Sequence, residues 1–209
     1  MTILLPTAYL PPISYISACA AADEILVEAW ETYPKQTSRN HCEIAGPNGR
    51  QRLTVPVNKP DGTHTKTKDI RIASHLPWQK IHWRSFEAAY NKSPFFLYYK
   101  DYLLPFYEKD YEFLLDFDLQ LLETLFQAIR LDKSTVTTES YEEAPPGIID
   151  LRNQLAVSSL QSPVTSNQSP VSNLPEYYQV FADRNGFMSD LSIVDLLFNL
   201  GPETLQYFS

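Results

Sequence analysis

The stretch TAYLPPISYISACAAADEILVEAW, residues 7–30, decides the fold that we expect for this chain. An apolar run at residues 2–6 precedes it and predicts a short buried strand. After the paired prolines, apolar and small residues recur at helical spacing and predict a helix of about ten residues. Residues 24–30 then predict a second strand. A strand, a helix and a strand in succession indicate a βαβ unit with parallel strands, and therefore an α/β fold.

The loop between the first strand and the helix carries two tyrosines and two adjacent prolines, which a buried crossover does not require. Such a loop is either a rigid structural corner or the rim of a site. In open parallel sheets, ligands bind at the carboxyl ends of the strands, where this loop lies. A polar segment at residues 33–40 follows the second strand and is expected at the same sheet edge. We therefore predict one pocket there, with these polar side chains: Tyr9, Tyr15, Lys35, Gln36, Ser38, Arg39, Asn40 and His41.

The two cationic side chains of this predicted pocket favour an anionic small molecule. Arg39 offers a bidentate fork and Lys35 offers a point charge, and both suit phosphate or carboxylate. We accordingly expect a small-molecule ligand such as a sugar nucleotide or another anion, and the sequence identifies no cofactor. The alternative is that Lys35 and Arg39 lie on a solvated loop and that Asn40 only caps a strand, because most loop charges do not act.

A helix predicted from Pro77 onward supplies the candidate catalytic residue, His82. Helical spacing places it on one stripe with Trp78, Ser85 and Ala89, facing the core or a cleft. An imidazole there can serve as a general acid or base near neutral pH. The alternative is a hydrogen-bonded core histidine. Ser85 lies within helical reach of His82, but the sequence has no G-x-S-x-G turn, and we do not expect a serine hydrolase.

Further elements follow from local patterns along the chain. Asn48-Gly49 between two β-rich runs predicts a hairpin, and residues 69–73 alternate like a half-buried strand that extends it to a meander. The middle third predicts helices, with an interruption near Pro105 and a further amphipathic helix through residues 114–128. Residues 134–141, rich in Thr and Val, predict another strand.

The C-terminal part combines a loop with a well-marked helix. Residues 156–175 are rich in Ser, Pro and Asn and are typical of a loop or linker. Asn185-Gly186 predicts a second hairpin. Ser192 and Asp195 fit a capping box, and Gly201 marks the end of the helix that they begin. We expect one domain over all 209 residues.

Composition limits the classes of function. The chain is 44% hydrophobic with a net charge of −8, so it can bury a substantial core and repels polyphosphate except at a local basic patch. We therefore expect no nucleic-acid partner. No run approaches the ~20 apolar residues that cross a bilayer, and we expect a soluble cytoplasmic protein without a membrane partner. The four histidines and two cysteines show no metal-ligand spacing, and we expect no metal. There is also no glycine-rich phosphate loop.

Several separate motifs occur in order: YLPP at 9–12 with Tyr15 close behind, KQT at 35–37, RN at 39–40, LTVPV at 53–57, Trp78, HW at 82–83, AY at 89–90 and PFF at 94–96. In this combination, residues 3 to about 125 resemble the WbqC-like protein family. The resemblance implies a bacterial α/β protein of surface-polysaccharide assembly, with a suggested part in attaching an amino-acid or acyl group to an amino sugar. It also implies these site residues: Tyr9, Pro11, Tyr15, Lys35, Arg39, Asn40, His82 and Tyr90. His41 stands where many members have arginine, which leaves Arg39 to carry the charge.

The first hypothesis for the function is a transferase that acts on a nucleotide-linked or phosphorylated amino sugar. In it, Lys35 and Arg39 bind the anion. Tyr9 and Tyr15 shape the pocket, and His82 is the candidate base.

Other hypotheses come from different classes of protein. A non-catalytic module could bind a carbohydrate or a protein through the aromatic-rich residues 90–111. The strand, Pro/aromatic loop, helix and strand also resemble nucleotidylyltransferases, although Tyr9 and Tyr15 stand where that class has histidines. This second resemblance implies a nucleotide-binding protein. A purely structural role is a further alternative, and the sequence does not indicate an oligomeric state.

Overall fold

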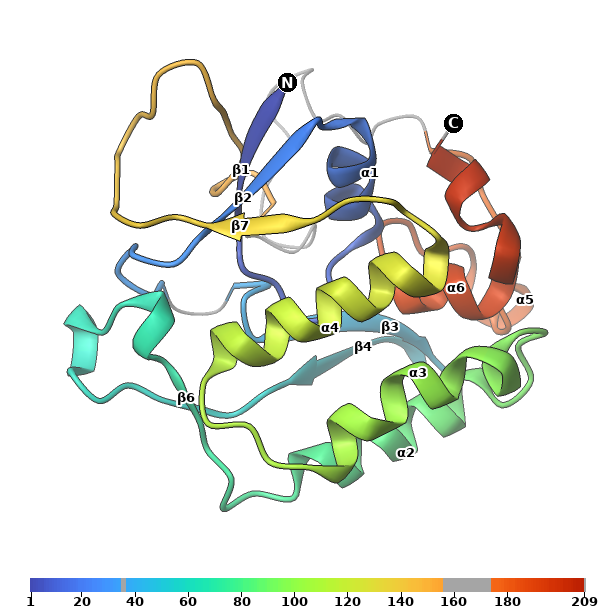
Figure 1. Ribbon diagram of the computed structural model, residues 1–209. Helices are drawn as coiled ribbons and strands as arrows, with labels where there is room; N and C mark the ends of the chain where they lie inside the picture. The colour runs from blue at the N-terminus through green and yellow to red at the C-terminus, as the bar shows by residue number, and fades with distance from the viewer. Residues whose placement is uncertain (35–36, 156–173, 209) are drawn as a thin grey trace.

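The computed structural model describes residues 1–34, 37–155 and 174–208, and Figure 1 shows their arrangement. Lys35 and Gln36 of the predicted pocket lie outside the described residues, as does most of the loop predicted at residues 156–175. The described chain has the predicted mixed α/β fold, with a parallel sheet, two-stranded hairpins, a helical middle and C-terminal helices.

The N-terminal βαβ unit has the predicted form. β1 (Thr2–Pro6) and β2 (Glu24–Glu28) pair in parallel along their full length, and α1 (Ile13–Ala21) connects them. β7 (Thr135–Thr137) lies beside β2, within the segment predicted as a strand. β8 (Ile149–Asp150), which the sequence did not indicate, lies beside β1. The order β7-β2-β1-β8 is parallel throughout, so the carboxyl ends of these strands meet at one edge.

The hairpin predicted at Asn48-Gly49 is confirmed and forms a sheet of its own. Its strands are β3 (His41–Gly46) and β4 (Gly49–Thr54), which pair antiparallel. Gly49 has a φ of +108°, a conformation that glycine adopts without strain.

A second two-stranded sheet follows the hairpin. β5 (Val57–Asn58) pairs with β6 (Arg71–Ile72), so the strand predicted at residues 69–73 is confirmed in a shorter form. This sheet is separate from the hairpin, so the predicted extension of the hairpin to a meander is wrong. Two 3-10 turns, η1 (Gly62–His64) and η2 (Thr67–Asp69), lie between these strands.

The predicted helical middle consists of α2 (Trp78–Tyr90), α3 (Phe96–Glu108) and α4 (Leu114–Ile129). The apolar stripe predicted for α4 is buried, at Leu114, Phe117, Leu121, Leu125 and Ala128. α3 contacts both α2 and α4, which makes the three helices one packed group.

The interruption predicted near Pro105 is wrong, because α3 continues through this residue to Glu108. Proline removes the hydrogen bond to the carbonyl four residues earlier, which here belongs to Asp101. Both Pro105 and Asp101 are exposed, so water can hydrate that carbonyl. The helix therefore tolerates the proline.

The hairpin predicted at Asn185-Gly186 is also wrong. Residues Ala182–Asn185 form a short helix, α5, in which the Phe181 carbonyl accepts from the N–H of Asn185 (2.9 Å). Gly186 ends this turn with a φ of +74°. Hairpin turns and helix ends both use a glycine with positive φ, so the dipeptide alone does not distinguish them.

α6 (Ile193–Leu200) begins where the sequence predicts. The Ser192 hydroxyl accepts from the N–H of Val194 (3.5 Å), as a cap does. The other half of the predicted capping box is not formed, because the Asp195 side chain bonds to groups elsewhere in the chain.

The predicted end of α6 at Gly201 is confirmed, with a φ of +56°. A Cβ at this position would lie 2.5 Å from the ring of Phe95, so only glycine fits. Two short turns, η3 (Gly201–Glu203) and η4 (Leu205–Phe208), follow.

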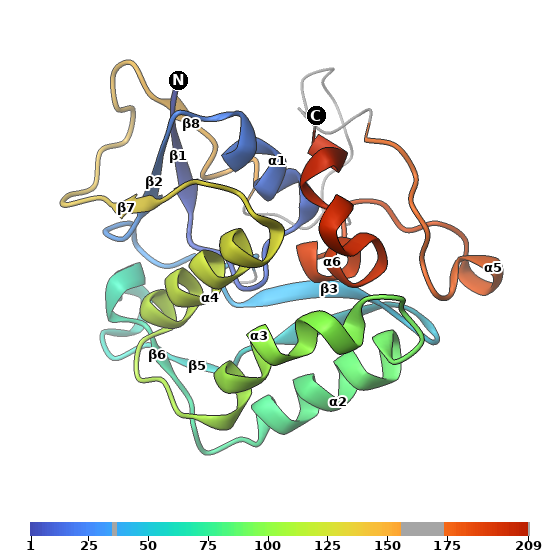
Figure 2. The ribbon, with the colours of Figure 1, turned by 45° about the vertical axis from the view of Figure 1, so that its right-hand side comes forward.

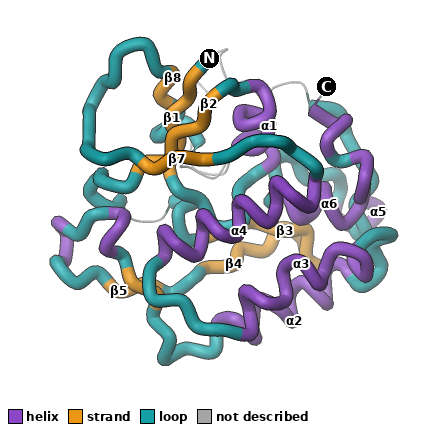
Figure 3. Tube along the Cα trace, in the orientation of Figure 1, coloured by secondary structure: helices purple, strands orange, loops and turns teal. Residues whose placement is uncertain are grey.

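The sheets and helices enclose one continuous hydrophobic core. Figure 2 shows β3 between α6 and α2, and both helices contact this strand. Figure 3 shows the long loop that connects β7 to β8 at the outside of the parallel sheet. Among the described residues, no helix combines the length and the apolar character needed to cross a membrane.

A buried hydrogen-bond network attaches the C-terminal part to α2. The Asp195 carboxylate accepts from the hydroxyls of Tyr90 (2.7 Å) and Tyr177 (2.6 Å) and from the amide of Gln179 (3.1 Å). Asp195 has no exposed surface, so these three donors replace water around it.

We expect Asp195→Ala to lower the free energy of unfolding by about 3 kcal/mol or more, because it leaves buried donors without an acceptor. Urea denaturation measures the change. Asp183→Ala, on the exposed part of α5, is the control and should stay within about 0.5 kcal/mol of wild type. Equal effects of the two substitutions would contradict the role of the network.

Candidate functional site

The loops that follow β1 and β2 lie side by side, as predicted for adjacent parallel strands. The N–H of Tyr9 donates to the carbonyl of Ser38 (3.0 Å), which joins the two loops directly. Leu10, fully buried beside this bond, has a φ of +42°. A leucine in the left-handed region is strained, and such strain persists only where the surrounding structure fixes it.

α4 adds a carboxyl group that the sequence analysis missed. Asp118 is buried, and its Oδ2 accepts from the hydroxyl of Thr7 (3.0 Å) in the loop after β1. Burial raises the pKa of Asp118 well above its ordinary value, although the bond from Thr7 lowers it. The sequence does indicate that Asp118 faces the core, because it lies four residues after Leu114 and three before Leu121 on the apolar stripe of α4.

Four buried polar groups around these loops have an atom without a hydrogen-bond partner among the described residues. These groups, called the polar centre below, are Tyr33, Thr37, Arg39 and Asp118. Burial raises the pKa of Tyr33, the charge of Asp118 raises it further, and the charge of Arg39 lowers it. Tyr33 therefore interacts electrostatically with both residues.

Of the remaining buried polar atoms without a partner in the described chain, that of His41 lies beside Thr37, whereas those of Ser93, Tyr111 and Asn199 lie on separate elements or loops. Buried polar groups are usually paired, so a cluster of unpaired ones indicates a site for a ligand.

Arg39 is not on a solvated loop, so that alternative is wrong for this residue. Its side chain is 1% exposed, and its Nε and Nη2 donate to the carboxylate of Glu31 at 2.7 and 2.9 Å. Nη1 has no partner among the described residues. Glu31 therefore balances the charge of Arg39 and leaves one nitrogen with donors for an anion.

Three lysines of the connection between β5 and β6 lie along the segment that leads into the polar centre. Lys59 lies over the ring of Tyr33 (4.7 Å to the centroid) and Lys68 over the ring of Trp30 (4.5 Å). Lys66 donates to the hydroxyl of Thr32 (3.3 Å). These three lysines are called the basic rim below, and one of them, Lys68, is paired with Asp69 (2.9 Å). The structure does not describe Lys35, whose role stays a prediction.

His82 is joined to the site through Tyr9. The Tyr9 hydroxyl lies 2.8 Å from Nδ1 of His82 and 2.7 Å from the hydroxyl of Tyr107. Burial lowers the pKa of His82 to about 4, although a bond to the backbone of Thr54 raises it. The tautomer of His82 decides whether Nδ1 accepts from the Tyr9 hydroxyl or donates to it. The geometry is that of a neutral, hydrogen-bonded histidine in the core, and a catalytic role stays a prediction.

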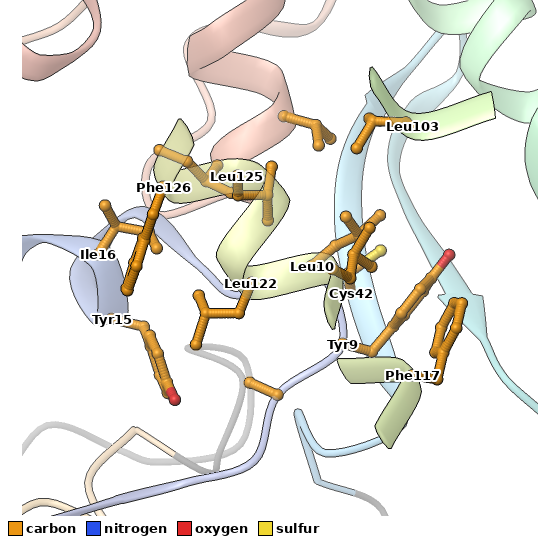
Figure 4. Packing of buried hydrophobic residues seen from close by; sticks show 14 of the residues in the cluster. Tyr9, Leu10, Tyr15, Ile16, Cys42, Leu103, Phe117, Leu122, Leu125 and Phe126 are labelled. Atoms are coloured by element: carbon orange, nitrogen blue, oxygen red, sulfur yellow. The ribbon is translucent and has the colours of Figure 1, made fainter. Parts of the chain in front are cut away.

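The two tyrosines of the opening loop do not point into one hollow. Figure 4 shows Tyr9 beside Phe117 and Cys42, and Tyr15 beyond Leu122 with its hydroxyl pointing away from Tyr9. The Tyr15 hydroxyl donates to the carbonyl of Pro6 (3.0 Å).

Four other predicted site residues are not members of the polar centre. Asn40 donates to the Val55 carbonyl (2.9 Å), and Tyr90 donates to Asp195. The Ser85 hydroxyl donates to the Ile81 carbonyl and accepts from Gln51, so it does not bond to His82. The fourth residue is His41.

His41 lies beside Thr37 of the polar centre, because its imidazole bonds to the Thr37 backbone, but it does not face Asp118. Strand alternation places it on the face of β3 opposite to Cys42, and Cys42 is the neighbour that interacts with Asp118. Burial and the charge of Arg52 lower the pKa of His41. In the described part of the chain, no three His, Cys, Asp or Glu side chains form a group that could bind a metal ion.

Comparison with known proteins adds the family. The model of the WbqC-like protein family matches residues 7–207. An uncharacterized protein of Mycobacterium tuberculosis, Rv1507c, is 27% identical over 222 residues, which cover 98% of this chain and 95% of that protein. No solved structure matches the chain.

We expect the protein to lose stability on acidification through His82. The unfolded chain takes up a proton near the ordinary histidine pKa of about 6.5, whereas folded His82 does so near pH 4. The stabilisation is therefore present above pH 6.5 and falls by about 2 kcal/mol between pH 7 and pH 5. His82→Gln should remove this part of the pH dependence, measured by urea denaturation at both pH values. His75→Gln, at an exposed position, should keep it; identical slopes for both variants would rule the explanation out.

Proposed function

Because the chain belongs to the WbqC-like protein family, we propose that it is a transferase of bacterial surface-polysaccharide biosynthesis. Its substrate in this proposal is a nucleotide-linked or phosphorylated amino sugar. The observation that supports it is the polar centre, four buried groups with unpaired atoms at the carboxyl edge of β1 and β2.

The charges around the polar centre suit a substrate with one anionic end. A chain with a net charge of −8 repels anions at long range, so binding one requires a local excess of positive charge. Lys59, Lys66 and Lys68 line the segment at residues 30–33. Lys68 is paired with Asp69 (2.9 Å), so the proposal assigns the excess to Lys66 and to the Nη1 side of Arg39. In the proposal, this basic rim and Nη1 of Arg39 bind the phosphate.

The neutral groups suit the sugar. The hydroxyls of Tyr33 and Thr37 are buried and have no partner among the described residues, so a ligand hydroxyl or ring oxygen would complete their hydrogen bonds. Such completion favours binding, because an unpaired buried hydroxyl costs about 1–3 kcal/mol.

His82 enters the proposal as the residue that orients Tyr9. A general base works best with a pKa near the operating pH, and a pKa of about 4 makes His82 a weak proton acceptor at neutral pH. Its Nδ1 does fix the direction of the Tyr9 hydroxyl. The geometry therefore supports a positioning role more than the predicted role as base.

A second candidate function has its own supporting observation. On α3, Tyr98 is 74% exposed and Tyr102 is 46% exposed, with Leu97 between Phe96 and Tyr98 also exposed. Tyr98 and Tyr102 are four residues apart and share a helix face, where phenol rings can stack on a sugar or a protein. Phe106 and Tyr107 are buried, so only this part of the aromatic-rich segment supports a binding module.

The nucleotidylyltransferase-like alternative has less support. In that reading a phosphate approaches the start of α1. There, the N–H and hydroxyl of Ser14 already donate to the carboxylate of Asp190, at 2.9 and 3.1 Å. A phosphate would have to displace this acceptor.

Tyr33→Phe tests the transferase proposal at the polar centre. The hydroxyl has no partner in the described structure and its burial costs free energy, so we expect the variant to be at least as stable as wild type. The Kd of UDP-glucosamine, measured by calorimetry, should rise about tenfold, which corresponds to one lost hydrogen bond.

Tyr111→Phe is the matched control, because it removes another unpaired buried hydroxyl outside the polar centre. It should leave the Kd unchanged. The second candidate function predicts the reverse sensitivity, with binding lost in Tyr98→Ala and Tyr102→Ala and kept in Tyr33→Phe. Absence of binding by any sugar nucleotide would refute the transferase proposal.

A further inference from the structure

Asp118 occupies a buried position of α4, where an apolar residue would be the usual choice. It lies on the buried stripe of α4 with Leu114, Leu121 and Leu122. A leucine there would bury more apolar surface, and a carboxyl group with an unpaired oxygen lowers stability. Its one described partner, the Thr7 hydroxyl, occupies Oδ2 and leaves Oδ1 without a donor among the described residues.

Among residues 1–34, 37–155 and 174–208, no cation pairs with Asp118. The titratable groups that interact with it come from the loop after β1, α1, the β2–β3 connection, β3 and α3, and they are Tyr9, Tyr15, Tyr33, Cys42 and Tyr107. Arg39 interacts with two of these neighbours, Tyr15 and Tyr33, and its charge is balanced by Glu31. Phenols and a thiol cannot neutralise a carboxylate, so a cationic donor is the missing partner.

Given the proposed function, on which this step rests, we propose that Oδ1 of Asp118 binds the primary ammonium group of the amino sugar. An ammonium supplies both a positive charge and hydrogen-bond donors, and such charge-assisted bonds are about twice as strong as neutral ones. A sugar hydroxyl would supply a donor without the charge. The site therefore distinguishes a free amine from a hydroxyl or an acylated amine.

The proposed amine site gives the burial of the Asp118 carboxyl group a function. Burial favours the protonated, uncharged form of Asp118 in the empty protein. Arrival of an ammonium reverses this preference, because the pair carries no net charge and its hydrogen bonds are complete. The phosphate of the same substrate then lies toward Lys59, Lys66 and Lys68, across the unpaired hydroxyl of Tyr33.

Binding of matched sugar nucleotides tests the proposal. We expect wild type to bind UDP-glucosamine at least tenfold more tightly than UDP-N-acetylglucosamine, in which the amine is acylated. Asp118→Asn should abolish this preference, and Asp116→Asn, exposed on the same helix, should keep it. Equal binding of the two ligands by wild type, or a preference that survives Asp118→Asn, would overturn the amine site and leave the transferase proposal standing.

A second measurement does not depend on the nucleotide. In protein labelled with 13C at the aspartate carboxyl carbons, the Asp118 signal is identified by its loss in Asp118→Asn. Glucosamine should shift this signal, whereas glucose and N-acetylglucosamine should not. A shift without any sugar-nucleotide binding would support the amine site and refute the proposed substrate; no shift with glucosamine would refute the amine site.

The pH dependence of the melting temperature distinguishes a ligand-binding role of Asp118 from a structural role. A carboxyl group whose folded pKa is raised destabilises the fold as pH increases above its ordinary value. We expect the melting temperature of Asp118→Asn to match wild type near pH 4 and to exceed it by several degrees at pH 8. A variant less stable than wild type at pH 8 would show that Asp118 serves the fold instead.

Discussion

The parallel pairing of β1 with β2 is the constraint on which the rest of the site depends. It brings the ends of both strands to one edge, and the bond from the Tyr9 N–H to the Ser38 carbonyl then holds the following loops together. Thr7 and Arg39 belong to these two loops, so the pairing also fixes what surrounds Asp118. A shift of one strand against the other would separate the polar centre.

The buried acidic side chains differ in how many hydrogen-bond or ion-pair partners they have. Asp195 receives three side-chain donors, and Glu28 is paired with Arg152 at 2.7 Å, with both side chains almost fully buried. Asp118 receives one donor. Glu43, also buried, is paired with Arg50 and Arg52, each at 2.9 Å. Since the described chain pairs a buried carboxylate at these three places, incomplete satisfaction at the fourth is better explained by a ligand than by poor packing.

Local patterns were sufficient for the βαβ unit, the first hairpin, α2, α4 and α6, because each has a clear period and boundary residues. They failed where one residue suits two structures, as Gly186 does at a helix end or a hairpin turn, and where exposure permits an exception, as at Pro105. The site was predicted only in part. Convergence of Tyr9 and Arg39 follows from parallel strands, whereas the position of Asp118 depends on how α4 packs across them, which no local pattern encodes.

Strain and unpaired groups coincide in this site. Leu10 holds a left-handed conformation in the loop that also carries Thr7 and Tyr9, and the unpaired atoms of Tyr33, Thr37 and Arg39 lie in the loop bonded to it. Each feature lowers the stability of the empty protein, and the large continuous core offsets the loss. A site whose donors and acceptors are fixed before the ligand arrives needs little reorganisation, so binding loses little free energy to ordering. The energetic cost in the empty state is therefore consistent with preorganisation, and it explains why these groups are clustered instead of spread over the fold.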